Sequence, residues 1–196
     1  VIHYKDNNSK DYFVWDKKSY GLTAYTLIYK AELSEKEYTY NGKVKKPSVR
    51  VILTNGMLLS GQGANYTVSY QKGRKNVGKY KGTVSFKGNL GSKEELFFTI
   101  KPQKVTVSSI SALKKGFKLK WKPVSGAITG YQVQYALKSS FSGAKTLWVK
   151  KADASSASVK KLKAKKKYYV RIRAYKTVDG AKIYSPWSVK KTVKTK

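Results

Sequence analysis

Lysine is the residue type through which this sequence could bind a partner. The chain of 196 residues carries 42 Lys and Arg against 10 Asp and Glu, a net charge of +32. A charge of this size repels itself in a compact fold, so we expect an anionic polymer to offset it. Because lysine lacks the planar fork of arginine, its abundance favours diffuse contact with a polyanion over recognition of one defined ligand.

Two groups of lysines are close enough in sequence to act together. The denser group contains Lys160, Lys161, Lys163, Lys165, Lys166 and Lys167. The second group contains Lys118, Lys120 and Lys122, which alternate with apolar residues. We expect this second group on one sheet face, beside outward-facing Arg171 and Arg173. The denser group either keeps a loop soluble or binds anions, and charge attraction does not distinguish teichoic acid, a heparin-like glycan and nucleic acid.

Tryptophan and arginine offer a second kind of contact. Trp187 could stack on Arg171 and Arg173 as a cation–π ladder, in which each pair contributes about 0.5–2 kcal/mol. The alternative is that the two arginines contact a ligand. Trp148 alternates with apolar neighbours, so it faces solvent if they face the core. There it could stack on a sugar, cover a neighbouring strand or touch the adjoining domain.

The side chains that most enzymes use are missing. The chain has no Cys, and its single histidine, His3, lies near one end, where we expect a surface residue. These counts give no support to a thiol nucleophile, a Ser-His-Asp triad or a zinc site. Glu32, Glu35 and Glu37 are close in sequence, but they flank the start of a strand and we expect them to balance nearby lysines. We therefore expect no catalysis, no cofactor and no bound metal.

The elements that position these residues are predicted to be strands. Short runs of Val, Ile, Thr, Tyr and Phe alternate with Gly, Asn, Ser and Lys, and no stretch has a 3.6-residue period. Tyr168, Val170 and Ile172 fall on one face of such a run, and we expect them in a core. About seven strands fit between residues 104 and 194, as in a β-sandwich.

A domain boundary is predicted at Lys101-Pro102, between two apolar runs. Residues 1–101 hold 18 basic and 8 acidic residues, a net charge of +10. Residues 102–196 hold 24 basic and 2 acidic residues, a net charge of +22. We expect residues 102–196 to bind polyanions more tightly than residues 1–101.

Four features of about residues 103–194 occur together. They are Trp121 on the second expected strand, the strand Gly130–Tyr135, the spacing of Leu162 and Tyr168, and the segment Tyr184–Ser188. Together they resemble the fibronectin type III domain. The resemblance implies a buried Trp121 and a tyrosine corner at Tyr168. The family often has Pro between that Leu and Tyr, where this chain has lysines.

Short segments of residues 27–101 resemble another family. They are Tyr38–Lys43, Lys46–Val51, Asn65–Tyr70, Asn76–Tyr80 and Gly88–Leu90. They are similar to the small immunoglobulin-like repeats of Gram-positive bacterial surface proteins. We expect turns between strands at eight glycines: Gly56, Gly61, Gly63, Gly73, Gly78, Gly82, Gly88 and Gly91. Residues 1–26 match neither family and are interpreted as an N-terminal extension or the tail of a preceding domain.

The expected architecture is therefore all-β, with two tandem immunoglobulin-like β-sandwiches at residues 27–101 and 102–196. The absence of Cys points to the cytosol or a bacterial surface, and no apolar run approaches the length of about 20 residues that spans a bilayer. Because the sequence starts at Val1 without a signal peptide, we interpret it as a piece of a larger protein.

The resemblances imply a non-catalytic scaffold or adhesion module, extracellular or on a bacterial cell surface. The lysines suggest retention on an anionic cell-wall polymer or glycan, and host extracellular matrix or carbohydrate is a further expected partner. One rival is a carbohydrate-binding accessory module of a secreted hydrolase, built around Trp148. A nucleic-acid binder is disfavoured by the shortage of Arg and the lack of a helix to enter a groove.

Overall fold

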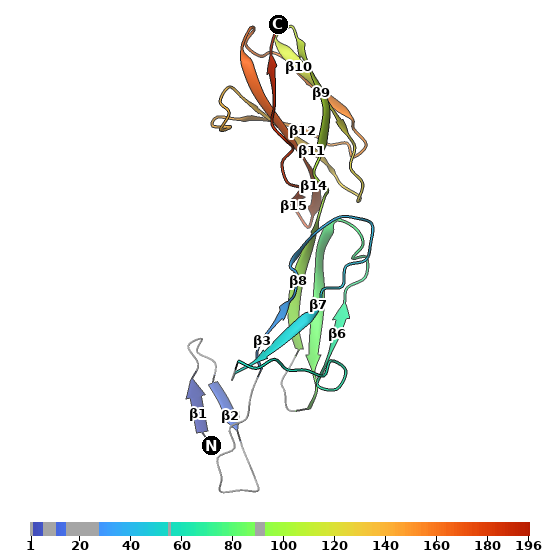
Figure 1. Cartoon of the computed structure of the whole chain (residues 1–196), viewed down its shortest axis with the longest axis vertical. Coiled ribbons are helices and arrows are strands. Elements are labelled where there is room, and N and C mark those ends of the chain that lie inside the picture. Colours follow the sequence, from blue (N-terminus) through green and yellow to red (C-terminus); the bar gives the residue numbers. More distant parts are fainter. Residues whose placement is uncertain (1, 6–10, 15–27, 55, 89–92) are drawn as a thin grey trace.

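The computed structural model describes residues 2–5, 11–14, 28–54, 56–88 and 93–196. Strands and their connections make up this part of the chain, and it contains no α-helix. The all-β prediction is therefore confirmed. Within the same residues, no helix is long and apolar enough to cross a membrane. Figure 1 shows two strand-rich bodies arranged end to end.

The second body is a sandwich of two antiparallel sheets. One sheet has the order β13–β10–β9, with β9 Thr106–Leu113, β10 Gly116–Lys122 and β13 Ser156–Val159. The other has the order β12–β11–β14–β15, with β11 Gly130–Ala136, β12 Lys145–Val149, β14 Lys167–Val178 and β15 Ala181–Tyr184. A further strand, β16 (Lys191–Lys194), pairs with the start of β14. The last of the seven strands expected from the sequence is thus divided into two, β15 and β16, and both pair with β14.

The core of this sandwich forms where the inward faces of the two sheets meet. Trp121 on β10 is 2% exposed, and its ring centroid lies 5.1 Å from that of Tyr131 on β11. Val170 and Ile172 on β14 are fully buried. The alternating pattern of β10 and β14 put these residues on one face of each strand, and their predicted burial is confirmed.

Tyr168 closes the end of this core. Its ring is buried beside Leu162, and its hydroxyl accepts a hydrogen bond from the backbone N–H of Lys163 at 3.3 Å. This is the expected tyrosine corner, which ties the loop before β14 to the strand itself. The lysines in the place where the family often has proline leave the corner intact.

The first body also contains two sheets. The smaller sheet pairs β3 (Ile28–Leu33) with β5 (Val49–Leu53). The larger has the order β4–β8–β7–β6, with β4 Glu37–Thr39, β6 Tyr66–Tyr70, β7 Gly78–Phe86 and β8 Lys93–Lys101. Strand β4 runs parallel to β8, and the other neighbours are antiparallel. Phe98 is the centre of the core, with the rings of Tyr38, Tyr70 and Tyr80 packed around it.

Two glycines of this body do not lie in turns, contrary to the sequence prediction. Gly78 and Gly82 are inside β7, where a Cβ atom on Gly82 would meet the Tyr70 ring at 2.9 Å. Their role is to leave room for aromatic rings that lie against the strand. Five others, Gly56, Gly61, Gly63, Gly73 and Gly88, have the positive φ of turn glycines. Gly91 lies outside the described residues.

At the N-terminus, β1 (Ile2–Lys5) pairs antiparallel with β2 (Asp11–Val14). The extension predicted for residues 1–26 otherwise lies outside the described residues, as does the side chain of His3.

Candidate functional site

Three segments that are far apart in sequence meet at one end of the second body. They are the turn between β9 and β10, the loop between β13 and β14, and the residues after β16. The backbone N–H of Lys115 donates to the carbonyl of Lys196 at 2.8 Å, and that of Leu162 donates to the carbonyl of Lys115 at 2.8 Å. The hydroxyl of Thr195 donates to the carbonyl of Lys163 at 2.7 Å. These bonds hold the three segments together as one layer of loops at the end of the sandwich.

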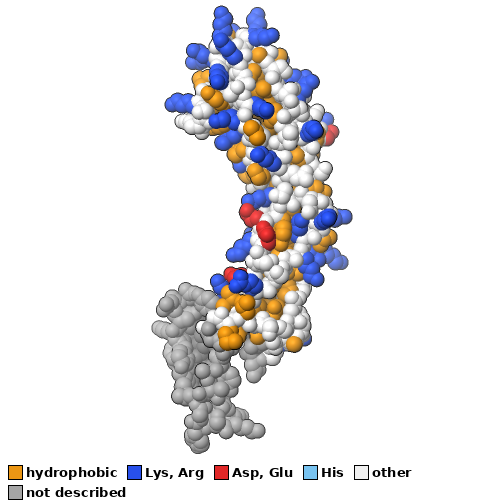
Figure 2. Space-filling model, in the orientation of Figure 1, with side chains coloured by type: hydrophobic (Ala, Val, Ile, Leu, Met, Phe, Trp, Pro, Cys, Tyr) orange, Lys and Arg blue, Asp and Glu red, His pale blue; other side chains and the backbone are white. Residues whose placement is uncertain are grey.

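We call this layer the basic end. All its lysine side chains are exposed: Lys114, Lys115, Lys160, Lys161, Lys163, Lys165, Lys166, Lys167, Lys194 and Lys196. Figure 2 shows Lys and Arg side chains projecting from the end of the molecule where Figure 1 places the C-terminus. The three segments contain no Asp or Glu. The basic end is therefore a dense array of positive charge without acidic neighbours along the chain.

The backbone of the basic end is held in an uncommon conformation. Lys115, Lys161 and Lys165 have φ values of 52°, 59° and 54°, in the left-handed region that residues with a Cβ rarely adopt. Such residues persist only where surrounding hydrogen bonds over-determine the chain. The bonds from Leu162 to Lys115 and from Lys165 to Thr195 supply that constraint. The lysines are thus presented from a fixed backbone.

The second lysine group lies on a different face from the one predicted. Lys118 and Lys120 point away from the core on β10, as the alternation indicates, and Lys120 and Lys122 are exposed. Arg171 and Arg173, however, lie on β14 in the opposite sheet. The prediction that the lysines flank these arginines is therefore wrong. Alternation identifies the outward face of each strand but does not indicate to which sheet the strand belongs.

Arg171 and Arg173 form the predicted ladder with Trp187. The Cζ atoms of the two arginines lie 4.2 and 4.3 Å from the Trp187 ring centroid. The ladder extends at both ends, because Arg171 also lies 4.1 Å from the Phe141 ring and Arg173 lies 3.5 Å from the Tyr184 ring. The sequence did not predict that Phe141 and Tyr184 belong to the ladder, because they lie in a loop and on an edge strand and not in the alternating pattern.

Neighbouring polar groups fix the ladder to the sheet. Gln134 on β11 accepts two hydrogen bonds from Arg171, at 3.0 and 2.7 Å, and Gln132 accepts one from Arg173 at 2.7 Å. Burial lowers the pKa of both guanidinium groups from its ordinary value. Such a ladder stabilises the sheet face and leaves the two arginines little freedom to follow a mobile ligand.

Trp148 faces outward on β12 and is 37% exposed, while Leu147 and Val149 pack against the core. Its ring meets that of Tyr175 edge-on, with centroids 5.1 Å apart, and the Lys182 ammonium lies 5.4 Å from the Trp148 centroid. The predicted orientation is confirmed. Trp148 reaches across β11 to Tyr175 on β14, and part of its ring remains open to solvent. Its role as a sugar-binding residue stays a prediction.

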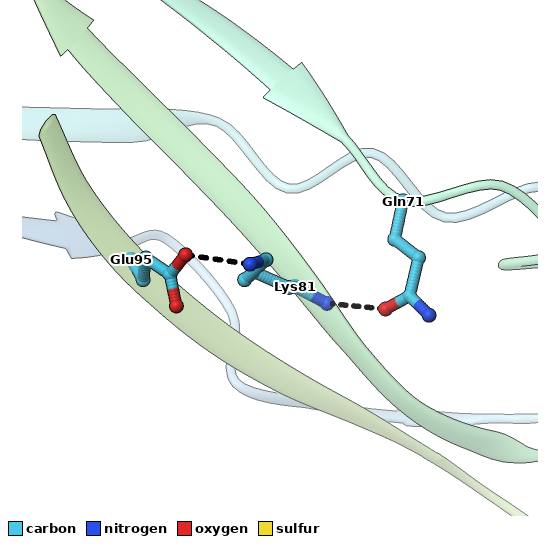
Figure 3. A network of polar contacts seen from close by, with 3 residues as sticks. All are labelled: Gln71, Lys81 and Glu95. Atoms are coloured by element: carbon cyan, nitrogen blue, oxygen red, sulfur yellow. Dashed lines mark hydrogen bonds and ion pairs between the residues drawn. The ribbon is translucent and has the colours of Figure 1, made fainter.

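The acidic residues of the first body mostly form ion pairs with lysines. Lys101 pairs with Glu37 at 2.6 Å, and Lys30 pairs with Glu32 at 3.4 Å. Figure 3 shows Lys81 bridging two groups across strands: its ammonium contacts Glu95 at 2.5 Å and its backbone N–H donates to Gln71 at 3.2 Å. The pairs of Glu32 and Glu37 agree with the expectation for these two residues, and the same expectation for Glu35 stays a prediction. Within the described residues, no cluster of acidic or histidine side chains could hold a metal ion.

Comparison with known proteins supports the architecture. Residues 100–189 match the fibronectin type III domain, which confirms the resemblance in this half. A two-domain fibronectin type III segment from chicken tenascin is similar in fold, with a TM-score of 0.56 and 12% identity over 86% of this chain and 99% of that one. The FN1–FN3 domains of chicken CNTN1 match with a TM-score of 0.44 and 16% identity over 84% of this chain and 66% of that one. No curated protein sequence matches the chain.

Fibronectin type III domains are typically non-catalytic modules and are common in extracellular proteins.

Proposed function

We propose that this chain is a non-catalytic extracellular scaffold or adhesion module of a bacterial surface or secreted protein. Its basic end retains that protein on an anionic cell-wall polymer or glycan. The observation that carries the proposal is the basic end itself, where three segments present exposed lysines with no acidic residue among them. Binding of this kind is driven by release of counterions from the polymer and does not require a shaped pocket.

The end-to-end arrangement fits such a role. The basic end lies at the extremity of the second body, away from the joint with the first body (Figure 1). A long polymer can approach this extremity without meeting the first body. The first body then holds the basic end away from the N-terminal part of the chain (Figure 1). The same chemistry suits anionic glycans of a host extracellular matrix.

A carbohydrate-binding accessory module of a secreted hydrolase is the second candidate, because Trp148 keeps part of its ring exposed. The two candidates differ in their response to salt. Contacts to six or more charges of a polyanion weaken by orders of magnitude between about 50 and 200 mM salt. Stacking of a neutral sugar on an aromatic ring changes little over that range.

Sedimentation with isolated Gram-positive cell walls tests the proposal. We expect the protein to sediment with walls that keep their teichoic acid and to be released as salt rises. Replacement of Lys160, Lys161, Lys163, Lys165, Lys166 and Lys167 by Gln is expected to abolish this retention. Equal sedimentation with walls stripped of teichoic acid, or retention that salt does not affect, would contradict it. In the latter case loss of binding in Trp148→Ala would favour the second candidate.

A further inference from the structure

A cleft of about 480 Å³ lies at the joint between the two bodies. Its walls come from both of them: Glu37 and Lys101 belong to the first body, and Arg173, Lys182, Tyr184 and Pro186 belong to the second. Figure 1 places β15, which carries Lys182 and Tyr184, beside the joint. The volume falls within the range of about 300–1,000 Å³ that is usual for ligand sites.

Direct contact between the bodies shapes this cleft in advance. The backbone N–H of Val77 donates to the carbonyl of Gly126 at 3.3 Å, and Val77 is 1% exposed. Gly126 has a φ of +108°, and a Cβ atom there would lie 2.8 Å from the Tyr40 ring. Only glycine permits both this backbone conformation and this close approach. The two walls of the cleft are therefore held together by a fitted joint.

The charge in the cleft is positive. Three cationic side chains, Lys101, Arg173 and Lys182, face one carboxylate, Glu37. Glu37 forms its ion pair with Lys101 at 2.6 Å, which leaves Arg173 and Lys182 without an acidic partner among the lining residues. Burial lowers the pKa of Arg173, because removing the guanidinium from water penalises its charged form. A bound anion would offset this excess charge.

A row of packed aromatic rings leads from the cleft to the outer face of the sheet, with Tyr175 buried at 3% exposure between the partly exposed rings of Tyr184 and Trp148. Tyr184 lines the cleft, and its ring centroid lies 6.4 Å from that of Tyr175, which in turn meets Trp148. Lys182 also lines the cleft, and its ammonium lies 5.4 Å from the Trp148 centroid. Rings with an apolar face and a polar edge suit amphipathic partners. A sugar ring, with its apolar C–H face and polar rim, is such a partner.

We propose that this cleft binds a negatively charged sugar unit of an extended glycan. The acidic group of the sugar contacts Lys182, and Arg173, which the ladder holds in place, adds a fixed positive charge beside it. A neighbouring ring of the sugar chain packs toward Tyr184 and Trp148. The cleft is open rather than enclosed, so it suits a length of chain passing through. Arg173 is six residues along β14 from Lys167 of the basic end, a separation of about 20 Å at about 3.3 Å per residue. The cleft is thus a second site, independent of the basic end.

A trimer of galacturonic acid and its neutral methyl ester are suitable probes, measured by isothermal titration against the whole chain at one fixed salt concentration. We expect the acid to bind and the ester to bind much more weakly. Lys182→Glu is expected to weaken binding of the acid by about tenfold or more, the effect of losing a hydrogen bond to a charged group. Lys138→Glu is the matched control, since Lys138 is an exposed lysine of the same domain outside the cleft.

Trp148→Ala tests the aromatic part of the site. It is expected to weaken binding of the acid trimer and to remove a change in tryptophan fluorescence on titration, with thermal melting as the check that the variant folds. The proposal is overturned if the acid trimer does not bind, if the ester binds equally well, or if Lys182→Glu and Lys138→Glu have the same effect. Unchanged binding of the acid in Trp148→Ala overturns the aromatic contact.

The test of the cleft can succeed or fail independently of the test of the basic end. A variant with Gln at the six lysines from Lys160 to Lys167 should still bind the acid trimer, whether or not it is retained on cell walls. If trimer binding is lost in that variant and kept in Lys182→Glu, the sugar is held by the basic end and the cleft proposal is wrong.

Discussion

The two sandwiches of this chain handle positive charge differently. In the first, lysines pair with carboxylates across strands, as Lys81 does with Glu95 and Lys101 with Glu37. In the second, Arg171 and Arg173 stack on aromatic rings, and the lysines gather at the basic end. Residues 102–196 contain only two acidic residues, so pairing of the first kind is scarcely possible there.

This difference shows what each arrangement of charge contributes to stability and to binding. Exposed ion pairs are worth about 0–1 kcal/mol each and neutralise the surface. Stacked arginines keep their charge while their planar faces are packed, so they stabilise the sheet. The exposed lysines of the basic end gain little from the fold and raise its self-repulsion. We infer that the second body carries charge for binding, whereas part of the charge of the first body is paired with carboxylates.

The largest expected effect is the loss of stability when the core of one body is disrupted and the core of the other is left intact. Trp121→Ala should destabilise the second body by about 3–5 kcal/mol, because it removes a fully buried ring. Phe98→Ala should do the same to the first body, since the rings of Tyr38, Tyr70 and Tyr80 surround it. Calorimetry should show that each variant lowers the melting of one body and leaves the other nearly unchanged. A single transition that both substitutions shift equally would show that the two sandwiches are not separate folding units.

The next effect compares stacking with ion pairing. Trp187→Ala removes the ring between Arg171 and Arg173 and should destabilise the second body by about 1–3 kcal/mol. Glu95→Gln removes the Lys81 ion pair and should cost about 1 kcal/mol or less. Chemical denaturation of each variant supplies both values. Equal small losses would mean that the ladder is a surface arrangement with little energetic weight.

A smaller effect concerns alkaline pH. Burial raises the pKa of Tyr131, whose hydroxyl accepts from the Val124 N–H and donates to the Ala152 carbonyl. The unfolded chain loses this proton above about pH 10, the ordinary tyrosine pKa, while the folded chain retains it. The stability due to Tyr131 is therefore present below about pH 10 and is lost as pH rises through the raised value. Tyr131→Phe, unfolded by denaturant at neutral and alkaline pH, should lose less stability with pH than the wild type.

The sequence predicted those features that depend on one strand at a time. Alternation on β10 and β14 was sufficient to predict burial of Trp121 and Ile172 and the outward direction of Arg171. Alternation on β12 placed Trp148 outward once Leu147 and Val149 were taken to face the core. These directions are local consequences of period-two side-chain geometry. The tyrosine corner was implied by the resemblance to the fibronectin type III domain, through the spacing of Leu162 and Tyr168.

Features that depend on which strands become neighbours were missed. The basic end includes Lys115 and Lys196 because the β9–β10 turn and the C-terminal residues meet through hydrogen bonds between distant segments. The lysine group on β10 was placed beside the wrong arginines for the same reason. The joint at Gly126 also needed the structure, because a single glycine in a loop gives no sign of which ring approaches it.

The most direct test of the central claim, that the basic end binds polyanions, compares two variants that have the same net charge. One variant replaces Lys160, Lys161, Lys163, Lys165, Lys166 and Lys167 by Gln. Its partner replaces six exposed lysines of the first body by Gln: Lys36, Lys43, Lys46, Lys72, Lys75 and Lys93. Both remove the same charge, and each is titrated with teichoic acid or heparin at several salt concentrations. We predict that the first variant loses most of its affinity and salt dependence and that the second stays close to the wild type. Equal losses would show that binding follows total charge and that the basic end is not a site.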